Sequence, residues 1–190
     1  AQFLGASRPE EVVALSNASE ALNLAANTLG TRLGPRDEVV ITIMEHHSNL
    51  VPWQLVCERT GAKLRWFDIT DDGQLDLDKA EREGLINEHT KVVSLALASN
   101  VLGTINPVQR IAQWAHQVGA VVVVDASQAV PQMPVNVTEL GADLLAFTGH
   151  KMLGPTGIGI LWGRYDLLDD LPPFLGGGEM IEVVRMTGST

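Results

Sequence analysis

The chain has 190 residues, of which 45% are hydrophobic and only 5% aromatic, and it carries a net charge of −10. This length suits one domain, and the apolar content is enough for a sizeable aliphatic core. The acidic balance argues against nucleic acid, which needs clustered Lys and Arg, and against anionic lipid, so we expect neither a nucleic-acid nor a membrane partner.

Short apolar runs alternate with amphipathic segments along the whole chain. In chain order, the predicted elements are a helix over 19–33, a strand over 39–43, a helix over 49–60, a strand over 64–67, a helix over 77–83, a strand over 92–97, a helix over 108–118 and strands over 121–124, 144–147 and 158–162. Strands that alternate with helices indicate βαβ units. We therefore predict an α/β fold, with a mostly parallel sheet flanked by helices.

Polar side chains follow four of the predicted strands, at the point where each strand ends. In open α/β sheets, ligands bind beyond the carboxyl ends of the strands. Each such residue taken alone is most simply a helix cap. Their joint appearance predicts one shared crevice. The residues are Glu45, His46 and His47, then Asn100, then Asp125, and finally Thr148, His150 and Lys151.

This set of residues is suited to an aldehyde cofactor that carries a phosphate. Lys151 could form a Schiff base with the aldehyde. Asp125 could pair with a pyridinium nitrogen and keep it protonated. An imidazole such as His47 could lie on the ring face and relay protons. A phosphate tail needs hydroxyls and a helix N-terminus, which Thr148 and the segment 17–20 could supply.

Five segments carry a resemblance to a known family, and they occur in the family's order over nearly the whole chain. They are EHHSNLVPWQ (45–54), SNVLGT (99–104), DASQAV (125–130), TGHKMLGPTGIG (148–159) and GGGEMI (176–181). The sequence resembles the class V aminotransferases and, within them, the Suf-type cysteine desulfurases and selenocysteine lyases. The resemblance implies that residues 1–190 are part of the large cofactor-binding domain of an aspartate-aminotransferase-like fold.

The resemblance also implies a role for each matching residue toward pyridoxal 5'-phosphate. Lys151 would hold the cofactor covalently, and His47 would stack on its ring and take part in proton transfer. The other implied cofactor contacts are Asp125 at the pyridine nitrogen, Gln128 at the phenolic oxygen, Asn100 near the ring or substrate, and Thr148, His150 and the Ala18–Ser19 loop at the phosphate. The family usually has a Gly-Thr-Thr-Glu loop where this chain reads Asn-Ala-Ser-Glu, so Ala18 offers no hydroxyl to the phosphate.

The family's catalytic cysteine, its substrate-binding arginines and a threonine lent by the second subunit would all lie beyond Thr190. The chain begins without a methionine and stops in a polar stretch, which indicates an internal piece of a longer polypeptide. Cys57 is the single cysteine and lies on a predicted helix with an apolar face, so we expect it to be packed rather than catalytic. A lone cysteine and no signal peptide fit a reducing, cytoplasmic setting.

The implied function is the conversion of L-cysteine to L-alanine, with transfer of the sulfur to an enzyme persulfide. The sulfur would pass to an acceptor protein, for iron–sulfur cluster assembly, and L-selenocysteine is a second candidate substrate. The family also implies a homodimer. Two alternatives stay open, namely another class V enzyme of the kynureninase or aminotransferase kind, and a non-catalytic scaffold. We expect no metal site, because no His or Cys spacing matches one and His46 and His47 are adjacent.

Overall fold

A seven-stranded sheet forms the centre of the computed structural model, which describes residues 1–177 and 183–189. The strand order is β1-β7-β6-β5-β4-β2-β3. The five strands from β3 to β6 are parallel, whereas β7 runs antiparallel to both β6 and β1. The strands are β1 (Val12–Leu15), β2 (Glu38–Thr42), β3 (Lys63–Phe67), β4 (Thr90–Ala96), β5 (Val121–Asp125), β6 (Leu144–Thr148) and β7 (Gly159–Gly163), with a separate pair β8 (Val184–Arg185) and β9 (Gly188–Ser189).

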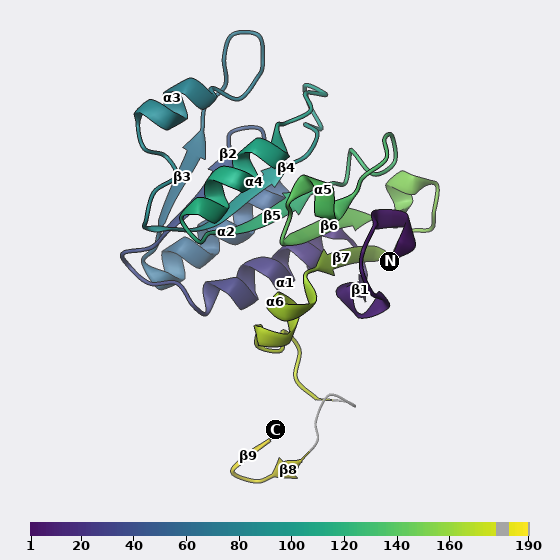
Figure 1. Cartoon of the computed structure of the whole chain (residues 1–190). Helices are drawn as coiled ribbons and strands as arrows, with labels where there is room; N and C mark the ends of the chain where they lie inside the picture. The colour runs from purple at the N-terminus through teal and green to yellow at the C-terminus, as the bar shows by residue number, and fades with distance from the viewer. Residues whose placement is uncertain (178–182, 190) are drawn as a thin grey trace.

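Helices cover both faces of this sheet, as Figure 1 shows. They are α1 (Ala18–Gly30), α2 (His47–Thr60), α3 (Leu77–Arg82), α4 (Val108–Gln117), α5 (Val137–Leu140) and α6 (Tyr165–Asp170), with short 3-10 turns η1 (Gln2–Leu4), η2 (Pro9–Glu11) and η3 (Gly149–Met152). The predicted α/β class and the mostly parallel sheet are confirmed.

Side chains of β5 alternate between two hydrophobic cores. Val122 and Val124 pack in the core that α4 closes with Ile111. Val123 points to the other core, which α1 and α2 close with residues such as Leu22 and Trp53. An uninterrupted valine run therefore serves both faces at once, which is the pattern of a central parallel strand. Within the described residues no helix is long and apolar enough to cross a membrane.

The sheet brings the carboxyl ends of three strands together. Ala96, the last residue of β4, pairs in register with Asp125, the last residue of β5. Asp125 in turn pairs with Ala146, two residues before the end of β6 at Thr148. Polar residues that follow these strands are thus brought to one edge of the sheet.

Candidate active site

A cavity of ≈170 Å³ lies at this edge, between the N-terminus of α1 and the ends of β4, β5 and β6. All the residues that the resemblance assigns to the cofactor, except His47, line it. Of the other polar residues predicted to share the crevice, His46 lines it and Glu45 does not. Asn17, Ser48 and Ser127 are also in its wall. The predicted residues that the cavity brings together are Ala18, Ser19, Asn100, Asp125, Gln128, Thr148, His150 and Lys151.

His46, rather than the expected His47, presents its imidazole to this cavity. His46 is the N-cap of α2, with extended backbone (φ −63°, ψ 143°), whereas His47 is already the first helical residue and is exposed. The two side chains therefore leave the backbone in different directions, although their rings remain 3.9 Å apart. The expectation for His47 is corrected to this extent: the imidazole in the wall belongs to its neighbour.

The capping geometry also orients the His46 ring. Its Nδ1 accepts a hydrogen bond from the backbone N–H of Ser48 at 3.2 Å, so in the neutral ring the proton is on Nε2. Burial, and next the nearby His47, lower the pKa of His46. We therefore expect a neutral imidazole at pH 7.

Asp125 is the buried carboxylate of the cavity and is 6% exposed. Its Oδ1 accepts the backbone N–H of Ser127 at 2.9 Å, which fixes the carboxylate at the strand end. A carboxylate held in this way inside a cavity is suited to pairing with a cationic ring nitrogen.

Lys151 lies in the short connection between β6 and β7. The two strands are paired antiparallel, and within the connection the N–H of Gly149 donates to the carbonyl of Ile158 at 2.8 Å. The η3 turn is closed by Leu153, which has a positive φ of 60°. The neighbouring Thr148 is buried, and its hydroxyl lies 3.0 Å from Nδ1 of His150. A connection anchored at both ends fixes where Lys151 enters the cavity.

The opposite wall is the first turn of α1. Asn17 caps the helix by accepting from the N–H of Glu20 at 2.9 Å, and the Glu20 carboxylate accepts the N–H of Ser16. Ser19 and Ser48 join α1 to α2 through hydroxyls 2.7 Å apart. A capped helix start with nearby hydroxyls can bind phosphate.

The chemistry of the wall tests whether the cavity suits a ring compound that carries a phosphate. The wall combines a lysine amine, a buried carboxylate, and hydroxyls beside a helix N-terminus. Ser127 lies in the same wall, and its Oγ is buried and has no hydrogen-bond partner within the described part of the chain. The residues present therefore fit pyridoxal 5'-phosphate, with phosphate donors on one side and a lysine and carboxylate on the other.

The sequence reasoning did not single out Ser127 or Ser48 as contacts, whereas Asn17 opens the 17–20 segment that was expected at the phosphate. Ser127 lies within the quoted segment 125–130, and its position two residues after a strand-end aspartate was the available signal. Ser48 carried no signal of its own, because its place in the wall depends on how α2 packs against α1.

Glu45 lies directly before His46, with its carboxylate enclosed by hydrogen-bond donors. It accepts from the Thr42 hydroxyl at 2.6 Å, the Asn49 amide at 2.6 Å and the Ala96 N–H at 3.0 Å. Burial raises the pKa of Glu45 to about 7 despite these hydrogen bonds, and the charge of Asp125 adds to the rise.

Cys57 is packed, as expected. It lies on α2, is 8% exposed and belongs to the core shared with α1. Burial raises the pKa of its thiol to about 11, so the nucleophilic thiolate is scarce at neutral pH. In residues 1–177 and 183–189, no group of three or more His, Cys, Asp or Glu side chains is arranged to hold a metal ion.

Comparison with known proteins gives a consistent family. The model of the class V aminotransferases matches residues 1–190. A probable cysteine desulfurase of Streptomyces coelicolor is 60% identical over 195 residues that cover 100% of this chain and 46% of that protein. The structure of the cysteine desulfurase CsdA of Escherichia coli superposes with a TM-score of 0.95 at 38% identity, covering 100% of this chain and 47% of CsdA.

A second solved structure is described as SspA in complex with cysteine. It superposes with a TM-score of 0.84 at 29% identity, covering 95% of this chain and 51% of SspA. The chain thus spans about half the length of the proteins that it matches.

Proposed function

Because the chain belongs to the class V aminotransferases, we propose that the protein of which it forms a part is a cysteine desulfurase. The proposed reaction converts L-cysteine to L-alanine and leaves the sulfur as an enzyme persulfide. Relatives named cysteine desulfurase at 50–60% identity and a similar structure determined with cysteine support this choice of substrate. Enzymes of this family depend on pyridoxal 5'-phosphate.

Each wall of the cavity offers one kind of contact to that cofactor. Lys151 would hold it covalently, Asp125 would bind the ring nitrogen, and Gln128 would reach the phenolic oxygen. Thr148, His150 and the start of α1 would take the phosphate. Bound in this way, the ring supplies an electron sink for carbanion chemistry at the amino acid.

Side chains of the protein would then hold and transfer the protons of the reaction. Asp125 keeps its position through the Ser127 N–H, so its carboxylate would be held in place to pair with the ring nitrogen. The neutral His46 ring offers an N–H at Nε2, and Lys151, which lines the same cavity, would supply an amine that can take up and return a proton. The thiolate that accepts sulfur must come from outside residues 1–190, because Cys57 is packed in the core.

The wider assignment is part of the same proposal. We propose a homodimer, an acceptor protein that takes the sulfur for iron–sulfur cluster assembly, a cytoplasmic setting, and L-selenocysteine as a second substrate. A large cofactor domain over residues 1–190, completed by a small domain elsewhere in the protein, also stays a prediction.

The observation that carries the proposal is the meeting of Lys151 and Asp125 in one cavity, whose opposite wall is the N-terminus of α1. The test is borohydride reduction of the cofactor-loaded full-length protein, followed by peptide mapping and by assays of alanine and sulfide with L-cysteine. We expect the pyridoxyl label on Lys151. A label on Lys63, Lys79 or Lys91 would overturn the assignment of the site, and turnover of kynurenine but not cysteine would assign a different class V activity.

A further inference from the structure

A hydrogen-bond network under the cavity centres on Glu45 and Asn49. Asn49 is fully buried on the first turn of α2. Its Oδ1 accepts from the Ser94 hydroxyl at 2.7 Å and from the Trp53 indole N–H at 3.3 Å. These two donors occupy the oxygen side of the amide, so the Nδ2 side must face Glu45, to which it donates at 2.6 Å.

The other oxygen of Glu45 connects this amide to the cavity wall. Oε1 accepts the Ala96 N–H at 3.0 Å and the Thr42 hydroxyl. Ala96 lines the cavity and lies in register beside Asp125. One carboxylate thus joins the end of β2, the end of β4 and the start of α2.

The same turn carries the imidazole that lines the cavity. Glu45 is the residue before His46, and the N–H groups of Asn49 and Leu50 donate to the His46 carbonyl at 2.8 and 3.1 Å. The backbone of His46 is therefore fixed from one side by Glu45 and from the other by the helix that Asn49 anchors. Polar networks of this kind fix one geometry only when every member is satisfied.

We infer that Glu45 is a positioning residue, which acts through Asn49 and the Ala96 N–H to hold the His46 imidazole and the Asp125 strand end in place for the cofactor. The inference rests on the proposed function, in that the cavity is taken to bind pyridoxal 5'-phosphate. Glu45 is absent from the cavity wall, so it acts through its neighbours rather than by contact.

The arrangement of hydrogen-bond donors and acceptors around Glu45 suggests a specific substitution to test its role. Glu45→Gln nearly keeps the shape but replaces one acceptor by an NH₂ donor. If that NH₂ faces Asn49, two donors meet; if it faces Ala96, it meets a backbone N–H. A flip of the Asn49 amide would instead set its NH₂ against the Trp53 N–H. Every arrangement leaves a buried donor without an acceptor, which is costly.

Exchanging the two functional groups should restore the network. In the double variant Glu45→Gln/Asn49→Asp, the new amide donates to the new carboxylate. The oxygen at position 49 still accepts from Ser94 and Trp53, and the oxygen at position 45 still accepts from Ala96 and Thr42. The net charge is unchanged, so recovery would report the hydrogen-bond pattern itself.

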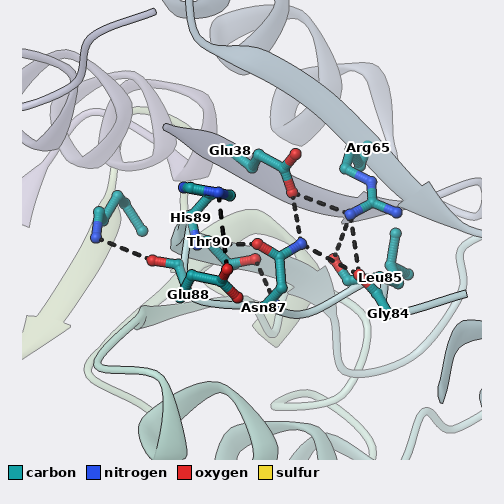
Figure 2. Close-up of polar contacts among 9 residues, drawn as sticks. Glu38, Arg65, Gly84, Leu85, Asn87, Glu88, His89 and Thr90 are labelled. Atoms are coloured by element: carbon teal, nitrogen blue, oxygen red, sulfur yellow. Dashed lines mark hydrogen bonds and ion pairs between the residues drawn. The ribbon is translucent and has the colours of Figure 1, made fainter. Parts of the chain in front are cut away.

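The opposite end of β2 offers a matched control, shown in Figure 2. Glu38 is a buried carboxylate that, like Glu45, accepts from an asparagine amide, that of Asn87 at 2.9 Å, and it pairs with Arg65 at 3.0 Å. Glu38 begins the strand, whereas the cavity lies beyond its other end. Glu38→Gln should therefore lower the melting temperature and leave the cofactor site unchanged.

The experiment measures three quantities on the full-length protein: the dissociation constant of added pyridoxal 5'-phosphate after the cofactor is stripped, the absorbance maximum of the bound cofactor, and the melting temperature. For Glu45→Gln we expect about tenfold weaker cofactor binding and a shifted absorbance maximum, since one buried donor loses its acceptor. The dissociation constant of the double variant should return to within about threefold of that of the original protein. Glu38→Gln should bind the cofactor as tightly as the original protein does.

The outcomes separate this inference from the proposed function. If the unaltered protein does not bind the cofactor, the proposed function fails. If it binds and folded Glu45→Gln binds equally well, or if Glu38→Gln weakens binding as much, Glu45 has no positioning role. A double variant that regains the melting temperature but neither the affinity nor the absorbance maximum would also overturn it, because that result describes a merely structural residue.

Discussion

Gly159, at the start of β7, lies so close to Asn17 that a Cβ at Gly159 would stand 2.2 Å from the Asn17 carbonyl carbon. The atoms in the way are backbone and cannot rotate aside. The absence of a side chain at Gly159 thus lets the strand after Lys151 approach the loop before α1, and the two walls of the cavity depend on this approach.

We therefore expect Gly159→Ala to displace the 17–19 loop and to weaken binding of pyridoxal 5'-phosphate by about tenfold or more, because the walls would separate. Titration of the stripped protein with the cofactor measures the effect. Gly34→Ala is the control, since its nearest neighbour would be an Asp37 oxygen at 3.9 Å. Equal cofactor affinity in both variants would contradict the close approach.

Asp125→Asn should reduce turnover far more than stability. The asparagine oxygen can still accept the Ser127 N–H, so the fold is kept, but the negative charge at the ring nitrogen is lost. We expect a loss in turnover of about 10²–10³-fold, comparable to other preorganised electrostatic contacts. Steady-state kinetics and thermal unfolding of the full-length protein check this.

Asp143→Asn is the matched control for that variant. Asp143 is equally buried but lies before β6, away from the cavity, where it accepts from the Val122 N–H and pairs with His116 and Arg164. The Asp143→Asn variant should be less stable, while its turnover per folded molecule should equal that of the original protein. Unchanged turnover in Asp125→Asn would show that Asp125 does not serve the ring nitrogen.

Cys57 should be inert in the folded protein. Burial raises the pKa of its thiol to about 11, and a buried thiol reacts with an alkylating reagent only when the structure opens. We expect slow labelling under native conditions, rapid labelling in denaturant, and no sulfide release from a chain limited to these 190 residues. If the 190-residue chain desulfurates cysteine and Cys57→Ala abolishes this activity, Cys57 is the nucleophile. The expectation that Cys57 is inert would then be wrong.

Glu45 should make stability depend on pH near neutrality. Its folded pKa, about 7, lies above the ordinary value of 4.5, because burial and then the charge of Asp125 disfavour the carboxylate. The folded state therefore binds the proton more tightly, so this contribution is fully present below about pH 4.5 and is lost as pH rises through 7.

The measurement compares urea unfolding of the original protein and Glu45→Gln between pH 5 and 8. In the original protein, deprotonation of Glu45 should lower the free energy of unfolding by about 2 kcal/mol. This is less than the full pKa shift implies, because the side chain is only partly buried. His46 lines the same cavity and its pKa is lowered by burial, so the contribution of Glu45 is taken from the difference between the two proteins. The same pH slope in both would contradict the raised pKa of Glu45.

Long periodic elements could be predicted from the sequence, whereas short edge elements could not. The predicted run 121–124 became β5, because four consecutive valines suit a strand buried on both faces. In contrast, β1 has four residues that lack a clear alternation of burial, and it is defined by pairing with β7 rather than by its own pattern. The helices α5 and α6 are likewise too short to give a helical period.

The site shows the same limit at the level of single residues. Most of the polar residues that follow strands line one cavity, because parallel strands end at a common edge, although Glu45 and His47 do not. The choice between His46 and His47 depended instead on which residue caps α2, and the exact start of a helix is not determined by periodicity. The Glu45–Asn49 network lay outside sequence reasoning because Asn49 meets Ser94 only through tertiary packing.

The pairing of β1 with β7 has a consequence for how the protein is made. Val12 pairs with Trp162, so β1 is synthesised about 150 residues before the strand with which it pairs. Until that strand is made, the edge of β1 is exposed, and pairings between distant segments form slowly and invite association with other chains. The cavity proposed to bind the cofactor spans the same two regions, α1 and the β6–β7 connection. Newly synthesised chains should therefore acquire the cofactor only after β7 has been made and paired.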